Sequence, residues 1–175
     1  LKNQRIVVVW VRATRTRDGE QTMSRKRGLG MHPALTLLAS KPRGEWPTLS
    51  FDGSCDMNGT RHATGRWGWL ITEADGTVIR QQSGRVVAEL VTNNVAEWVA
   101  LRNGLLALDH TTPGVTIQGD SMLVIKTLRA YWASKAPALT LLRAECWEIL
   151  DQLGRPWTAS WIPREKNHMA DALTR

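Results

Sequence analysis

The sequence predicts an α/β fold in which helices pack on a mixed five-stranded sheet. Three segments with strand character, separated by short turns, open the region after residue 45. Beyond them, apolar strand segments alternate with segments of helical spacing, so that the expected order of elements is βββαβααβα. Strands that are joined through helices run parallel, and the sheet should therefore be antiparallel at one side and parallel at the other.

The first three strands are expected at residues 48–54, 67–72 and 77–86. Pro47 stands immediately before the first strand, where it interrupts no ladder. A glycine-containing loop separates the first strand from the second, and the turn A-D-G-T joins the second to the third. These connections are short enough for an antiparallel meander.

The remaining elements alternate. A helix over 94–108 ends at H-T-T-P-G, and V-T-I-Q-G at 115–119 forms a short buried strand. A second helix is expected at 121–129 and a third at 138–153, where apolar residues recur on one face before a glycine. The last strand, 157–162, is ended by a proline, and M-A-D-A-L-T-R has the composition of the start of a final helix.

Composition indicates one globular domain with an uneven distribution of charge. The chain has 175 residues, of which 42% are hydrophobic, and a formal net charge of +7. Ten of its 23 Lys and Arg residues lie within residues 1–45, against three of its 16 acids, so the rest is neutral. We expect residues 1–45 to be a basic arm that is disordered or outside the core, and residues 46–175 to be the domain. Two interpretations of the arm have equal weight: its cations bind nucleic acid, or it is an arginine-rich leader without a role.

Two further features bear on location and redox chemistry. The apolar run at 6–11 is shorter than the hydrophobic region of a secretory signal, which favours a cytoplasmic protein with no membrane partner. Cys55 and Cys146 show no metal-ligand spacing and are expected to be free, buried thiols.

Four acids in separate elements carry most of the functional information. They are Asp52 in L-S-F-D-G-S, Glu97 in T-N-N-V-A-E-W, Asp120 in T-I-Q-G-D-S and Asp171 in N-H-M-A-D-A-L. Asp52 is the last apolar-strand residue before G-S, so its side chain is expected at a strand end, and Asp120 is expected at the end of V-T-I-Q-G-D. Glu97 lies in the first turn of a helix and Asp171 starts another, so both can point back to the same strand ends. Carboxylates brought together repel one another, and divalent cations relieve that conflict. Mg²⁺ prefers such oxygen ligands, and two ions can promote phosphodiester hydrolysis. Each acid taken alone is also explained as a turn or cap residue.

The motifs D-G-S-C, T-N-N-x-x-E, G-D-S and A-D-A-L, in this order, resemble ribonuclease H of the type 1 branch over about residues 48–175. The resemblance implies an RNase H-like fold and endonucleolytic cleavage of the RNA strand of an RNA/DNA hybrid by a monomer that uses two Mg²⁺ ions, with Mn²⁺ as a substitute. By this resemblance Asp52, Glu97, Asp120 and Asp171 are the metal-binding catalytic acids.

The same resemblance assigns substrate contacts. Asn58 and Asn94 match positions that contact the RNA strand, and Thr92 matches one that helps to hold a phosphate of the DNA strand. Gly53, Ser54 and Asn93 are expected beside them, because backbone groups and amides can test for a 2′-hydroxyl.

The chain departs from many family members in two respects. The glycine-rich loop with a histidine is replaced by the compact segment P-R-E-K-N-H, in which His168 is a possible auxiliary residue or only a surface histidine. A basic protrusion after the second helix is also missing. Two alternatives to a stand-alone enzyme stay open: the ribonuclease H domain of a reverse transcriptase or mobile-element polyprotein, and a non-catalytic nucleic-acid-binding module.

Overall fold

A computed structural model describes residues 46–130, 132 and 136–175 of the chain. The predicted basic arm at residues 1–45 lies outside these residues, so its role and the domain boundary stay predictions.

The described part is built on one sheet with the strand order β3-β2-β1-β4-β5. Strands β1 (Thr48–Asp56), β2 (Thr64–Thr72) and β3 (Val78–Arg85) form the predicted antiparallel meander. Strands β4 (Val115–Gly119) and β5 (Trp157–Trp161) extend the sheet beyond β1 in parallel. The predicted mixed five-stranded sheet is confirmed.

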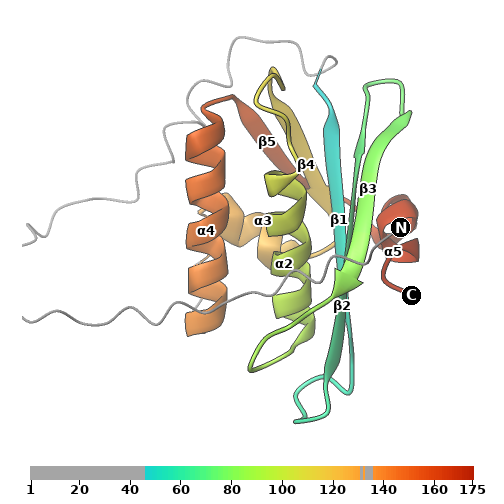
Figure 1. Ribbon diagram of the computed structural model, residues 1–175, viewed down its shortest axis with the longest axis vertical. Coiled ribbons are helices and arrows are strands. Elements are labelled where there is room, and N and C mark those ends of the chain that lie inside the picture. The colour runs from blue at the N-terminus through green and yellow to red at the C-terminus, as the bar shows by residue number, and fades with distance from the viewer. Residues whose placement is uncertain (1–45, 131, 133–135) are drawn as a thin grey trace, which may run out of the picture.

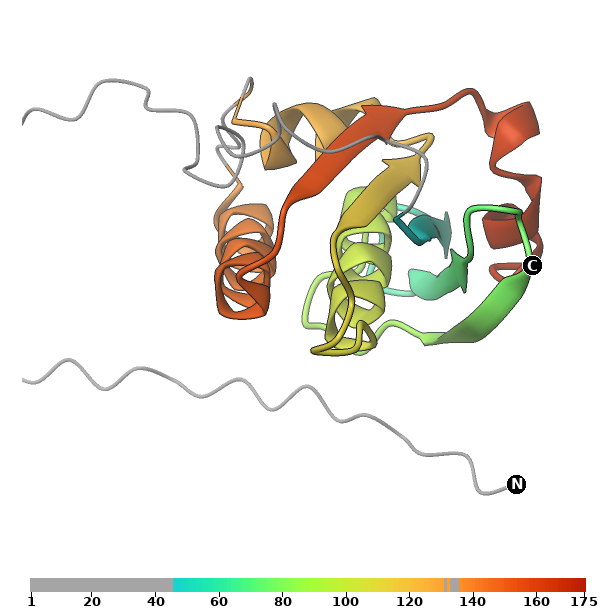
Figure 2. The same cartoon turned by 90° about the horizontal axis from the view of Figure 1, so that it is seen from above.

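Helices cover both faces of the sheet. The helices α2 (Asn93–Leu106), α3 (Met122–Leu128) and α4 (Pro137–Leu153) lie on one face, and the short α5 (His168–Ala172) lies on the other (Figure 1). Seen from above, α2 and α4 run beside each other under the sheet (Figure 2). A 3₁₀ turn, Arg164–Lys166, leads from β5 into α5. The predicted order of elements is therefore confirmed, with ends that differ by up to three residues.

The main core fills the space between the sheet and the three-helix layer. It contains fully buried aromatic side chains from both layers, among them Phe51, Trp69, Trp98 and Trp157. Large rings bury much apolar area each, and this burial holds the helices against the sheet.

Strand β1 is longer than the sequence predicts, and this changes the place of Asp52. Antiparallel pairing with β2 continues to Asp56, whereas parallel pairing with β4 stops at Ser50 and Gln118. The sequence predicts Asp52 at the end of a strand, but the structure places it in the middle of β1. Strand β4 nevertheless ends at Gly119, so the edge of β1 is open beside Asp52.

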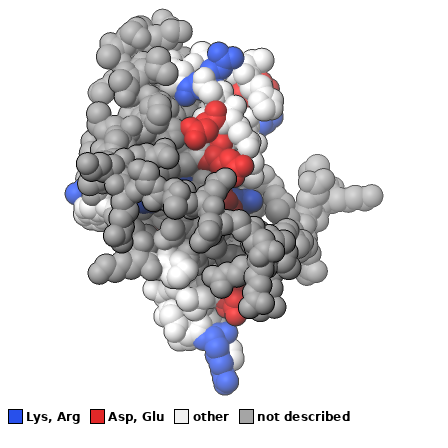
Figure 3. Space-filling view, turned by 90° about the vertical axis from the view of Figure 1, so that its left-hand side faces the viewer, with Lys and Arg blue, Asp and Glu red and all other residues white. Residues whose placement is uncertain are grey.

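The surface on the α4 side carries both signs of charge, as Figure 3 shows for the part that is not grey. No helix within the described residues has the length and apolar character needed to cross a bilayer. Cys55 and Cys146 are free, as predicted, but only Cys146 is buried.

Candidate active site

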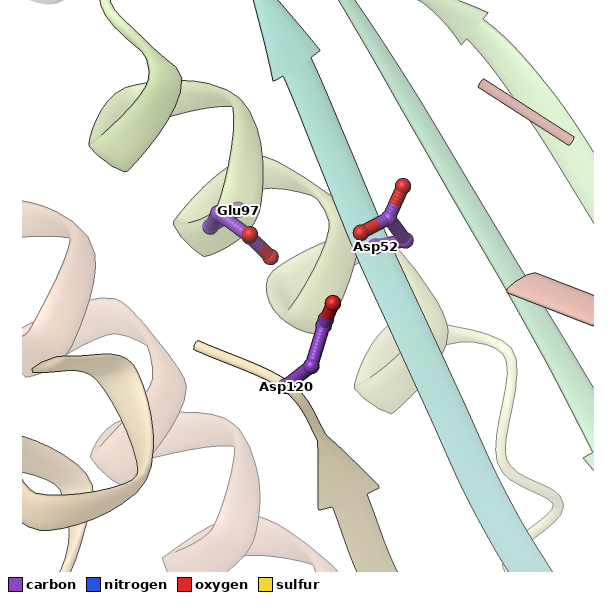
Figure 4. A group of neighbouring side chains, drawn as sticks. All are labelled: Asp52, Glu97 and Asp120. Carbon is purple, nitrogen blue, oxygen red and sulfur yellow. The ribbon is translucent and has the colours of Figure 1, made fainter. Parts of the chain in front are cut away.

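Three acids from three elements converge at the open edge of β1. Ligand atoms of Asp52 on β1, Glu97 on α2 and Asp120 after β4 all lie within 4.8 Å of one another. Figure 4 shows the three side chains directed toward a common centre. Asp52 and Glu97 are only 4% and 5% exposed, whereas Asp120 is partly exposed. The cluster therefore opens to solvent on the Asp120 side.

Gly53 explains how Glu97 reaches the strand. A side-chain carbon on Gly53 would overlap the backbone of Ala96 and Glu97, so only glycine lets the first turns of α2 pack directly on β1. Thr92 begins this helix by accepting a hydrogen bond from the Val95 amide at 3.2 Å. The motif D-G-S and the motif T-N-N-x-x-E thus act together as one packing unit.

Burial and charge repulsion raise the pKa values of Asp52 and Glu97. Burial, opposed in part by a hydrogen bond from Thr174, raises the pKa of Asp52 to about 6, and the charges of Asp120 and Asp171 add to the rise. Burial also raises the pKa of Glu97 well above its usual value, with Asp52 and Asp120 as further causes. The Oε2 atom of Glu97 is buried and has no hydrogen-bond partner within the described part. A buried carboxylate oxygen in this state calls for a cation.

The donor set fits a hard divalent cation. Three carboxylates provide oxygen ligands, which Mg²⁺ and Mn²⁺ accept, and no histidine or cysteine belongs to the cluster. The orphaned Glu97 oxygen and the raised pKa values both have the simple explanation that the site is organised for added positive charge.

Asp171 lies next to the cluster but differs from its members. It is buried and within electrostatic range of Asp52, yet its carboxylate pairs with the guanidinium groups of Arg164 and Arg175. The hydrogen bond from Arg175, aided by Arg164, lowers the pKa of Asp171. The structure therefore brings three of the four predicted acids together and places the fourth beside them, neutralised by arginine.

Two residues of the C-terminal segment support the cluster, and sequence reasoning missed both. The side chain of Asn167 is buried, and its amide nitrogen lies 2.9 Å from both Phe51 O and Asp120 Oδ1. The hydroxyl of Thr174 lies 2.6 Å from Asp52 Oδ2. The available signal was that two polar residues, Asn167 and Thr174, flank Asp171 at helical spacing, one four residues before it and the other three after it.

The predicted substrate-contacting residues gather at the start of α2. The amide of Asn93 donates to Asn58 Oδ1 at 3.1 Å, which ties the β1–β2 loop to the helix. Asn58, Asn93 and Asn94 are exposed, and Thr92 is partly exposed. Thr92 is the N-cap residue of this helix.

Gly53 and Ser54 have partners of their own. The Gly53 amide bonds the Glu97 carboxylate, and the Ser54 hydroxyl donates to Thr174 O at 2.9 Å.

His168 is on the surface at the first residue of α5. Its Nδ1 lies 3.3 Å from the carbonyl oxygen of Glu165, and the residue belongs to none of the contacts around the three acids. This placement favours the interpretation of His168 as a surface residue.

Comparison with known proteins agrees with this geometry. Residues 50–175 match a family described as reverse transcriptase-like. Ribonuclease HI of Halobacterium salinarum is 31% identical over 140 residues, which cover 79% of this chain and 67% of that protein.

Two solved structures have the same architecture. RNase H1 from Halobacterium salinarum superposes with a TM-score of 0.65 at 30% identity, over 73% of this chain and 93% of that one. LC11-RNase H1, solved in complex with an RNA/DNA hybrid, gives a TM-score of 0.65 at 26% identity, over the same shares of both chains. Together with the family match, these likenesses show that the chain has the RNase H-like fold and belongs to the ribonuclease H family.

Proposed function

We propose that this chain is a ribonuclease H of the type 1 branch that hydrolyses the RNA strand of RNA/DNA hybrids with two divalent metal ions. The observation that carries the proposal is the convergence of Asp52, Glu97 and Asp120 within 4.8 Å in a member of this family. A pure binding module has no use for such a cluster, because negative charge facing a phosphate backbone weakens binding.

The three acids would hold the metal, with Asp171 as the proposed fourth ligand. Bound divalent ions supply the charge that stabilises the attacking and leaving oxygens of a phosphodiester displacement. The protein's part is to keep Asp52 and Glu97 ready in buried positions and to leave Asp120 open toward the substrate. Asp171 would exchange its arginine partners for this role.

Recognition of RNA is assigned to the rim at the start of α2. The contact between Asn58 Oδ1 and the Asn93 amide uses the side-chain oxygen and leaves the Asn58 amide nitrogen as a donor. A 2′-hydroxyl both donates and accepts, so exposed amides such as Asn58 and Asn94 suit it. The complex of LC11-RNase H1 with a hybrid supports this substrate class.

The second candidate function is the same reaction, carried out by this chain as a domain of a longer protein. The reverse transcriptase-like description of the matching family favours a ribonuclease H domain of a polyprotein. The reading frame upstream of residue 1 distinguishes the two, because a polyprotein would continue there into a polymerase.

Strand-specific cleavage tests the proposal. Labelled RNA/DNA, RNA/RNA and DNA/DNA duplexes are incubated with the protein in Mg²⁺, in Mn²⁺ and in EDTA. We expect cleavage of the RNA strand of the hybrid alone, with either metal and not in EDTA. Comparable cutting of a DNA duplex, or activity that persists in EDTA, would overturn the proposal.

A further inference from the structure

Thr174 is a buried residue that touches the acidic cluster without belonging to it. It is 4% exposed, and its Oγ1 lies 2.6 Å from Asp52 Oδ2 and 3.0 Å from the carbonyl oxygen of Asp171. A hydroxyl has one proton to donate, and both neighbours are acceptors. The shorter distance falls in the range of a bond between a hydroxyl and an ionised carboxylate, so the proton belongs to the contact with Asp52.

The position of Thr174 is itself fixed from several sides. Its carbonyl oxygen accepts the Ser54 hydroxyl at 2.9 Å, and its amide donates to Asp171 O at 3.1 Å. A side-chain carbon on Gly68 would stand 3.3 Å from the Thr174 methyl, so strand β2 packs closely against Thr174. A hydroxyl held in this way can determine the orientation of its acceptor.

Asp52 needs such a partner. Its direct neighbour across the strand pair is Gly68, which has no side chain to pack against it. The torsion that turns a carboxylate about its last bond has a broad energy minimum, so packing or hydrogen bonds must set it. Figure 4 shows one oxygen of Asp52 turned toward Glu97 and Asp120 and the other turned away.

We propose that Thr174 is a positioning residue whose hydroxyl fixes the Asp52 carboxylate in the orientation that binds a divalent cation together with Glu97 and Asp120. The inference rests on the proposed metal-dependent function. Thr174 touches no substrate in this account and acts through Asp52 alone. Hydrogen-bond partners of metal ligands typically contribute about 10- to 100-fold to metal affinity or activity.

Two substitutions separate the hydroxyl from the rest of the side chain. Thr174→Val keeps the branched shape and removes the hydroxyl, whereas Thr174→Ser keeps the hydroxyl and removes the methyl. Thr127→Val makes the same chemical change at a buried threonine on α3, which contributes nothing to the cluster, and serves as the control. Thr174→Ala removes the hydroxyl without altering the backbone and replaces the valine variant if that variant fails to fold.

The test measures Mn²⁺ affinity of the full chain by electron paramagnetic resonance of the free ion, and in parallel the Mg²⁺ concentration that gives half-maximal hybrid cleavage. We expect Thr174→Val to raise the Kd for Mn²⁺ by about 10- to 100-fold and to shift the Mg²⁺ requirement in the same direction. Thr174→Ser should stay within a few-fold of the wild type, and Thr127→Val should not change.

Two results would overturn the inference. Wild-type Mn²⁺ affinity in a folded Thr174→Val protein would show that the hydroxyl does not position Asp52. A Thr174→Ser protein as weak as Thr174→Val would assign the effect to the methyl group and to packing. Failure of the proposed function looks different: the wild type would bind Mn²⁺ without cleaving a hybrid, and the binding data would still decide the role of Thr174.

Discussion

Replacing Asp52 with asparagine should make the metal-free protein more stable at pH 8 and change it little at pH 4. The pKa of this acid rises from 3.8 in the unfolded chain to about 6 in the folded one, mainly through burial. An acid with a higher pKa in the folded state costs stability above its unfolded pKa. The penalty is absent well below pH 3.8, grows between pH 3.8 and 6, and is constant above that window. Asparagine carries no charge, so the Asp52→Asn protein does not have this loss of stability.

The size of the effect follows from the same pKa values. A rise of about two units corresponds to about 3 kcal/mol, at about 1.4 kcal/mol per unit. The full amount applies at pH 8, and less than about 1 kcal/mol remains at pH 4. For a domain of this size, about 3 kcal/mol shifts the melting temperature by roughly 10 °C.

The assay is thermal unfolding in EDTA at both pH values, with Asp75→Asn as the matched control. Asp75 is an exposed acid in the β2–β3 turn, and hydrogen bonds from Thr77 lower its pKa, so its replacement should give no gain at pH 8. The reasoning is refuted if Asp52→Asn stabilises the protein equally at both pH values or destabilises it at pH 8. With Mg²⁺ present, the variant should lose the stabilisation that metal binding gives the wild type.

Three further predictions concern other parts of the chain. Gly53→Ala should lower the free energy of unfolding by about 1–3 kcal/mol or more and weaken metal binding, because the added methyl group overlaps the start of α2. Thermal melting measures the first effect and Mn²⁺ titration the second. A wild-type melting temperature would contradict the packing argument. His168→Ala should leave kcat within a few-fold of the wild type, since the residue is exposed, whereas a general acid or base typically contributes about 10²- to 10⁴-fold. Deleting residues 1–45 should keep activity but raise KM and flatten its dependence on salt if the ten cations bind substrate; identical salt slopes would exclude that role.

The order of the elements was predictable because local patterns decide it. Turn residues, apolar runs and helical spacing each extend over a few positions, and the meander and the helices α2, α3 and α4 follow from them. The end of β1 was not predictable in this way. The expected strand ends at residue 54, but pairing with β2 continues to Asp56.

The cluster was predictable only in part, for a related reason. Asp52, Glu97 and Asp120 stand in motifs that indicate their roles. The contacts of Asn167 and Thr174 join residues more than 40 positions apart, and no local pattern reports them. The pairing of Asp171 with Arg164 and Arg175 depends on how the 3₁₀ turn leads into α5, which the sequence P-R-E-K-N does not reveal.

The most direct test of the central claim adds Mg²⁺ to a preformed complex of the protein with an RNA/DNA hybrid whose two strands carry different fluorophores. The wild type and Glu97→Gln are compared, because the Glu97 carboxylate has a buried oxygen that lacks a hydrogen-bond partner within the described residues. We predict that Mg²⁺ starts cleavage of the RNA strand alone in the wild type and has no such effect in Glu97→Gln, although both bind the hybrid. Cleavage by Glu97→Gln at the wild-type rate, or a wild type that binds hybrid and Mg²⁺ but leaves the RNA intact, would contradict the account.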